Sequence, residues 1–180
     1  MYRLSLAVAA VLAACSTTKP ASTESTGGTT GPTAAPQQGG VVETRYDEAK
    51  DTTVVRLRPA RALGEGTVLI LGTTHPGRTP RRPETALLGF SRTAAAWRWE
   101  GCQTLTLIGG EGRTLATVPV SRDTQIGDGK LTEILSTVVP YEVVRALAAS
   151  VHPAAKLCGE DRPFTDEECS AIRQLVQRLP

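Results

Sequence analysis

The chain has 180 residues, with 20 Lys and Arg against 18 Asp and Glu and a formal net charge of +2. This length accommodates one domain of ordinary size and an appendage. Leaving out Arg3, Lys19 and Glu24, the charged residues of positions 1–40, leaves 18 basic against 17 acidic residues in positions 41–180. Such near-neutrality argues against a general polyanion binder, so we expect no nucleic-acid partner.

The N-terminus has the features of an export signal. Arg3 supplies a positive charge, and the 11 residues that follow, 4–14, are all apolar or small. This run is too short to span a bilayer core of about 30 Å, which needs roughly 20 helical residues. It fits the hydrophobic region of a secretory signal peptide, so we expect residues 1–14 to be removed on export.

The apolar run ends in the motif Leu12-Ala13-Ala14-Cys15. This motif resembles the lipobox of bacterial prolipoproteins. The resemblance implies that Cys15 receives diacylglycerol on its sulfur, that the chain is cut before Cys15, and that the new N-terminus is acylated. Two or three acyl chains form a stable membrane anchor, whereas a single chain binds reversibly.

The same resemblance implies a place in the cell envelope, where Ser16, in place of an Asp, favours the outer membrane of a bacterium with two membranes. It covers about 15 residues and implies nothing about the rest of the chain. Two alternatives stay open: an ordinary secreted protein with a cysteine near its cleavage site, and a cytosolic protein with an apolar N-terminus.

Residues 15–40 are expected to be the lipidated cysteine and a linker. Residues 16–40 contain no Val, Ile, Leu or aromatic residue and are mostly Ser, Thr, Gly, Pro, Ala and Gln. Such a segment cannot bury enough apolar surface to offset the entropy of ordering. As a flexible coil it would hold the domain about 25–30 Å from the membrane.

Strand patterns fill the first half of positions 41–180, the expected globular domain. Residues 52–58 alternate apolar and polar, whereas residues 67–72 are apolar on both faces and predict a central strand. Residues 85–91 are a third candidate strand. Residues 105–108 and 113–120 flank a Gly-Gly-Glu-Gly turn and predict a hairpin, whose second arm lies at an edge or ends at Pro119.

Helical patterns dominate the second half. Residues 131–138 carry apolar residues at helical spacing, and residues 141–150 resume that spacing after Pro140. Residues 151–158 are expected to form a last short strand. Thr165 and Glu168 predict a capping box at the start of a closing helix. The prediction is an α+β domain, an antiparallel sheet of about five to six strands covered by C-terminal helices.

Three cysteines remain if Cys15 is lipidated, and export permits disulfides. Strand alternation places Cys102 and Cys158 on the same side of their strands, which favours a Cys102–Cys158 bond with Cys169 as a buried thiol. Cys158–Cys169 and the absence of any disulfide are the alternatives.

No catalytic residue, cofactor site or metal site is predicted. His75 and His152 have no Cys, Asp or Glu at ligand spacing and are expected to be surface or loop residues. No serine stands in a nucleophile-elbow motif, and the Gly-rich turn lacks the ending of a phosphate-binding loop. Asp123, Asp128 and Gly129 do not follow the spacing of a calcium loop.

Two features are candidates for an interaction surface. Arg78, Arg81 and Arg82 lie in a Pro-rich loop that could contact anionic headgroups or an acidic partner. Trp97 and Trp99 would lie on one face of a strand and, if exposed, form a stacking platform. The simpler interpretations are a solvated loop and two core tryptophans.

These observations favour a non-catalytic binding or adaptor module, held at the membrane by its lipid, with an envelope protein or an anionic envelope component as partner. The alternative is an envelope hydrolase whose active site is assembled by the fold and has no recognisable motif.

Overall fold

The computed structural model describes residues 41–58, 66–127 and 129–179. The predicted signal peptide, the lipobox with Cys15, the linker and Asp128 lie outside the described residues. The described residues belong to one compact unit.

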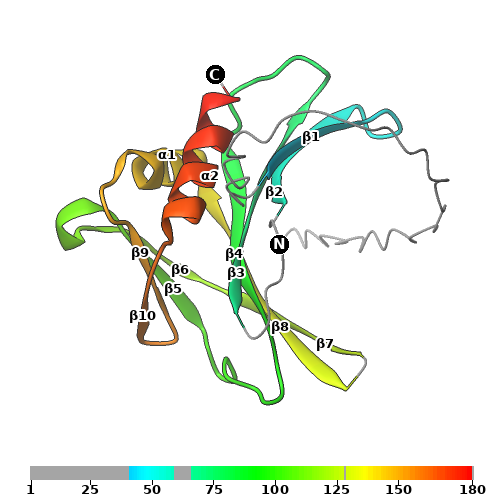
Figure 1. Cartoon of the computed structure of the whole chain (residues 1–180). Helices are drawn as coiled ribbons and strands as arrows, with labels where there is room; N and C mark the ends of the chain where they lie inside the picture. The colour runs from blue at the N-terminus through cyan, green and yellow to red at the C-terminus, as the bar shows by residue number, and fades with distance from the viewer. Residues whose placement is uncertain (1–40, 59–65, 128, 180) are drawn as a thin grey trace, which may run out of the picture. The chain divides into compact units, whose positions relative to one another are not determined.

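Ten strands and two helices make up the described part of the chain (Figure 1). The strands are β1 (Val41–Asp47), β2 (Thr52–Arg58), β3 (Thr67–Pro76), β4 (Thr85–Ala94), β5 (Thr104–Ile108), β6 (Thr114–Pro119), β7 (Ser121–Gly127), β8 (Lys130–Pro140), β9 (Ala154–Leu157) and β10 (Glu160–Pro163). The helices are α1 (Tyr141–Ala149) and α2 (Asp166–Gln177), and a short turn of 3₁₀ helix (Gly110–Gly112) joins β5 to β6.

The strands form two antiparallel sheets. The larger has six strands in the order β1-β2-β3-β4-β8-β7, and the smaller has four in the order β10-β9-β5-β6. The chain passes from the smaller to the larger sheet at Val120, between β6 and β7. Edge strand β6 ends at Pro119, as the sequence predicted, because proline has no N–H to continue a ladder.

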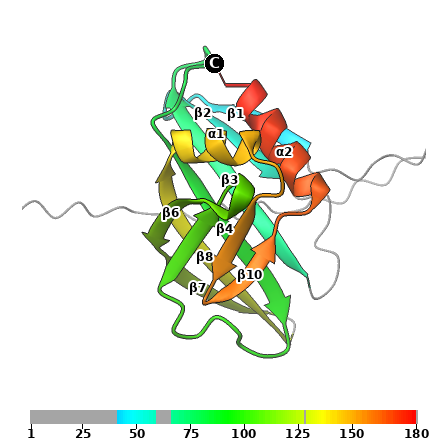
Figure 2. The ribbon, with the colours of Figure 1, turned by 90° about the vertical axis from the view of Figure 1, so that its left-hand side faces the viewer.

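One face of the six-stranded sheet, here called the inner face, carries the core. Its residues alternate with those of the opposite, outer face along each strand, so that Val55, Leu71, Leu88 and Leu135 are buried on the inner side. The helices and the four-stranded sheet lie on this side in both views (Figures 1 and 2).

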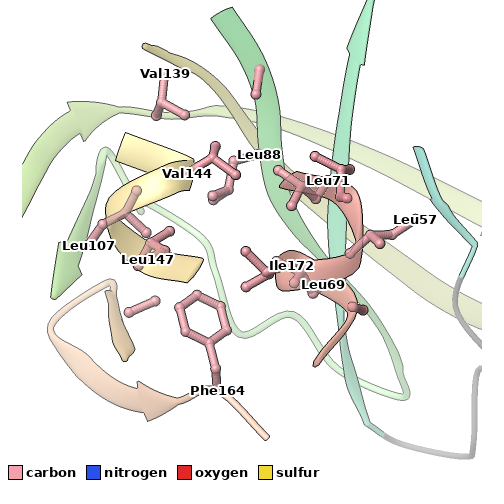
Figure 3. Close-up of a cluster of buried hydrophobic side chains, with 14 of the residues drawn as sticks. Leu57, Leu69, Leu71, Leu88, Leu107, Val139, Val144, Leu147, Phe164 and Ile172 are labelled. Carbon is pink, nitrogen blue, oxygen red and sulfur yellow. The ribbon is translucent and has the colours of Figure 1, made fainter. Parts of the chain in front are cut away.

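Side chains from all these elements interlock in one core (Figure 3). Val144 and Leu147 of α1, Ile172 of α2 and Leu107 of β5 point toward the aliphatic side chains of β3 and β4. Phe90 of β4 stacks on Phe164, with ring centroids 6.1 Å apart, which joins the larger sheet to the segment that leads into α2.

Helix α2 begins as the sequence predicted. The Thr165 hydroxyl accepts from the Glu168 N–H, and the Glu168 carboxylate accepts from the Thr165 N–H at 3.0 Å. This capping box satisfies two backbone donors at the helix start. Arg162 also donates to the Glu168 carboxylate at 2.5 Å, so the helix start is tied to β10.

The α+β class and the antiparallel sheet covered by C-terminal helices are confirmed, and the second sheet adds to them. The helix predicted at residues 131–138 is wrong, because these residues form most of β8. Apolar side chains occupy both faces of β8: Leu135 and Val139 point inward, whereas Ile134 and Val138 point outward. Apolar residues on both faces reproduce helical spacing by coincidence.

Candidate functional site

The arginines of the Pro-rich loop, which joins β3 to β4, do not form a cluster that points outward together. Arg78 donates to Glu48 at 2.6 Å and its guanidinium lies 4.2 Å from the centre of the Tyr46 ring. Arg82 donates to the Glu142 carboxylate of α1. Arg81 is exposed. Two of the three charges are thus matched by carboxylates of neighbouring elements, which weakens this loop as an anion-binding site.

The tryptophans do not form a platform, and the predicted strand at residues 97–99 is wrong. Both lie in the connection between β4 and β5, where Trp99 is 4% exposed and part of the core while Trp97 is 39% exposed. The Arg122 guanidinium lies 5.0 Å from the centre of the Trp97 ring. Trp99 is therefore a core residue and offers no surface to a partner.

A buried carboxylate that the sequence did not single out fixes this connection. Glu133, on the inner face of β8, is 2% exposed and accepts from the N–H groups of Arg98 and Trp99 at 2.8 and 3.0 Å. Arg122 of β7 donates to it at 2.9 Å. Burial disfavours the charge, but these hydrogen bonds outweigh burial and hold the pKa of Glu133 below its ordinary value. Because both of its carboxylate oxygens already accept hydrogen bonds from the protein, Glu133 has a structural role.

The structure joins Cys102 to Cys158, the predicted pairing. Both cysteines lie just outside the strands, Cys102 before β5 and Cys158 in the turn after β9, so the pairing of β5 with β9 brings them together rather than alternation within a strand. Cys169 is a buried thiol on α2, and burial raises its pKa, so it remains protonated.

His75 is buried, contrary to the prediction of a surface or loop residue. Strand β3 continues through Pro76, and the inward alternation of Leu71 and Thr73 extends to His75, which is 3% exposed. His152 is exposed, as expected. Within residues 41–58, 66–127 and 129–179, no three His, Cys, Asp or Glu side chains converge as metal ligands.

A concave site lies on the outer face of the six-stranded sheet. It has a volume of about 620 Å³, within the range of about 300–1,000 Å³ typical of ligand pockets. Its outward side chains come from four adjacent strands, and we call it the outer-face hollow. They are Val54, Arg56, Arg58, Ile70, Gly72, Thr74, Thr85, Leu87 and Val138.

The strand register explains why the outer-face hollow is there. One row across the sheet runs from Arg56 to Gly72, then to Leu87, and then to Val138. Gly72 has no side chain in the middle of this row, and a Cβ atom there would lie 3.3 Å from the Cβ of Arg56. The glycine thus leaves a space between an arginine on one side and two aliphatic side chains on the other.

The aliphatic end of the row is exposed. Leu87 and Val138, which lie opposite each other on β4 and β8, are 45% and 58% exposed. An antiparallel sheet with one covered face normally presents polar side chains on the other. A contiguous apolar area on the open face is typical of a binding site.

The other end of the row is cationic. Glu43 on β1 lies opposite Arg56 and accepts from Arg56 at 3.2 Å and from Arg58 at 3.0 Å. Hydrogen bonds from Arg58 lead the interactions that hold the pKa of Glu43 below its ordinary value. One carboxylate is thus shared by two guanidinium groups, which leaves a net positive charge at this end.

The sequence carried a partial signal for the outer-face hollow. Residues 67–72 are apolar on both faces, which predicts a central strand. Strand β3 is central in its sheet, but Ile70 on its outer side is only half-buried. Threonine, arginine and aliphatic side chains around the hollow equip it for binding through apolar contact and cationic hydrogen bonds.

Across the described residues, no helix combines the length and the apolar character needed to cross a bilayer. No protein-family model, curated protein or solved structure matches this chain.

Proposed function

We propose that this protein is a lipid-anchored component of the bacterial cell envelope, with a folded domain that acts as a non-catalytic binding module and the outer-face hollow as its binding surface. The observation that carries the proposal is an exposed apolar hollow of about 620 Å³ on the open face of a sheet whose other face carries the core.

The shape and chemistry of the hollow support binding. Side chains from β2, β3, β4 and β8 line it, and hydrogen bonding between strands holds these elements in register. A site on a rigid sheet needs little ordering when a ligand arrives, which favours affinity.

Lipid anchoring would limit the partners of this surface. Lipidation at Cys15 would keep the domain at the membrane, where it meets envelope components.

The proposed partner is an envelope protein or an anionic envelope component. The cationic side of the hollow supports an anionic partner, because Arg56 and Arg58 share one carboxylate, Glu43, and keep a net positive charge. The near-neutral charge of residues 41–180 keeps nucleic acid outside this proposal.

The test is photo-crosslinking of the full-length lipoprotein in its own membranes. A photoreactive amino acid replaces Leu87 in the hollow, and in the matched control it replaces Thr124, which is exposed on the opposite side of the same sheet. We expect a defined adduct from position 87 and none from position 124. Equal labelling at both positions, or none at position 87, would exclude the hollow as the binding surface.

The same purified protein tests the anchor. Mass spectrometry of its N-terminal peptide should show cleavage before Cys15 and a mass increase from acyl chains on that residue. A chain that starts at Met1, or an unmodified Cys15, would rule out lipid anchoring while leaving the crosslinking result intact.

A further inference from the structure

We propose that the outer-face hollow binds an anionic amphiphile with a single alkyl chain, such as a free fatty acid, with the chain over Gly72 and the anionic head at Arg56 and Arg58. This inference rests on the proposed function, since it assumes that the hollow is a binding surface, and it names the class of ligand.

The row of residues across the sheet is charged at one end and aliphatic at the other, as such a ligand is. It begins with the charged pair Glu43 and Arg56, passes through Gly72, and ends with Leu87 and Val138. The lining contains no charged side chain on β3, β4 or β8. A ligand that fits this order of groups is charged at one end and aliphatic at the other.

The dimensions of the row fit one alkyl chain. Three inter-strand steps of about 4.8 Å separate Arg56 from Val138, which gives roughly 14 Å. This is close to the length of an extended decyl or dodecyl chain. Val54 and Ile70 stand beside the row and supply the remaining apolar walls.

The sign of the head group follows from the charges at the β1–β2 end. Arg56 and Arg58 share one carboxylate, Glu43, so these three side chains carry a net charge of +1. The side chains of Arg56 and Arg58 are 60% and 71% exposed, so their guanidinium groups remain open to a second acceptor. Guanidinium groups bind carboxylates and phosphates through paired hydrogen bonds, which a neutral or cationic head cannot accept in the same way.

The first experiment measures binding as a function of chain length. Calorimetry uses the soluble, exported chain from residue 16 onward, because the described residues belong to one compact unit that has its own core and needs no lipid. The ligands are octanoate, decanoate, dodecanoate, tetradecanoate and hexadecanoate below their micelle concentrations. We expect Kd to fall by up to about fourfold for each added methylene until the chain spans the row, and then to level off.

The second experiment varies the head at constant chain length. Dodecanoate is compared with the neutral monoglyceride of the same acyl chain and with dodecyltrimethylammonium. We expect dodecanoate to bind roughly fivefold more tightly than the monoglyceride, and the cation to bind most weakly. The double variant R56Q/R58Q should abolish this order while keeping the dependence on chain length. Arg113→Gln, an exposed arginine beside β6 of the four-stranded sheet, is the control and should change nothing.

A bulky side chain placed in the hollow tests whether the amphiphile binds there. Thr74 is exposed and lines the hollow, so Thr74→Trp should abolish binding, whereas Thr124→Trp on the other side of the sheet should not. Thermal unfolding shows whether both variants remain folded. If Thr74→Trp is unfolded, Leu87→Ser replaces it, and a severalfold weaker binding of dodecanoate is then the expected result.

Three results would overturn the inference. If Thr74→Trp does not weaken binding, or if the Kd does not depend on the charge of the head group, the amphiphile binds elsewhere. Self-association that is abolished by Thr74→Trp would make a second copy of the chain the occupant. Failure of all the amphiphiles, together with a protein crosslinked through position 87, would end this inference and leave the proposed function standing; failure at position 87 as well would end both.

Discussion

The inner and outer faces of the six-stranded sheet share the same strands but differ in their surroundings. On β4, Leu88 is fully buried among helices and the second sheet, whereas its neighbour Leu87 is 45% exposed in the outer-face hollow. Both faces carry aliphatic residues, but only the inner face has an internal partner among the described elements. The comparison teaches that an apolar side chain in this sheet serves stability on one face and remains available for recognition on the other.

The neighbouring leucines of β4 give the largest expected contrast. Leu88→Ala leaves a cavity in a packed core and should lower the free energy of unfolding by about 2–5 kcal/mol. Leu87→Ala removes an exposed side chain and should change it by about 0.5 kcal/mol or less. Urea denaturation of both variants checks this. Equal losses would mean that the outer face is covered in solution and that the proposed binding surface is closed.

The two arginine-bound carboxylates give the next contrast. Glu133→Gln removes a buried charge that accepts from Arg122 and two backbone N–H groups, and we expect a loss of about 1.5–3 kcal/mol. Glu43→Gln on the outer face should leave unfolding unchanged within error, because its pairs with arginine are exposed to water. The same denaturation series measures both. A Glu133→Gln variant as stable as the wild type would show that the Glu133 charge is not needed to hold the connection at residues 95–103.

Two glycines of the outer face, Gly89 and Gly72, distinguish a position that the fold requires from one that leaves space for a ligand. A Cβ atom at Gly89 would lie 2.2 Å from the Leu135 carbonyl oxygen, so Gly89→Ala forces backbone movement and should cost about 1–3 kcal/mol or more. A Cβ at Gly72 meets its nearest neighbour at 3.3 Å, and Gly72→Ala should cost less. The melting temperatures of the two variants show which substitution destabilises the fold more. If Gly72→Ala were the more damaging, the hollow would be a requirement of folding.

The smallest expected effect is on the pH dependence of stability. Since the pKa of Glu133 is lower in the folded state than in the unfolded state, Glu133 contributes stability that is present above the unfolded value and lost as the pH falls through the folded value. The wild-type protein should therefore lose stability below about pH 4.5, and Glu133→Gln should flatten this loss. Thermal melts from pH 7 to pH 3 check it, and an unchanged slope in the variant would show that other carboxylates dominate.

Local sequence signals predicted the elements whose causes are local. The capping box of α2 needs only Thr165 and Glu168, and the hairpin of β5 and β6 needs only its Gly-rich turn. Strand β8 was mistaken for a helix because apolar residues on both of its faces imitate helical spacing. The sequence revealed only part of the outer-face hollow. The apolar character of residues 67–72 was evident, but the exposure of their outer face was not.

The sequence by itself determined the α+β class, the hairpin turn and the capped closing helix, because each depends on neighbours along the chain. Only the tertiary structure decided that Glu133 is buried, since its donors Arg98 and Trp99 lie 35 and 34 residues away. It also decided that Gly72 stands between Arg56 and Leu87, because strand register is set by pairing among distant segments. The hollow arises from that register, and no local pattern could have located it.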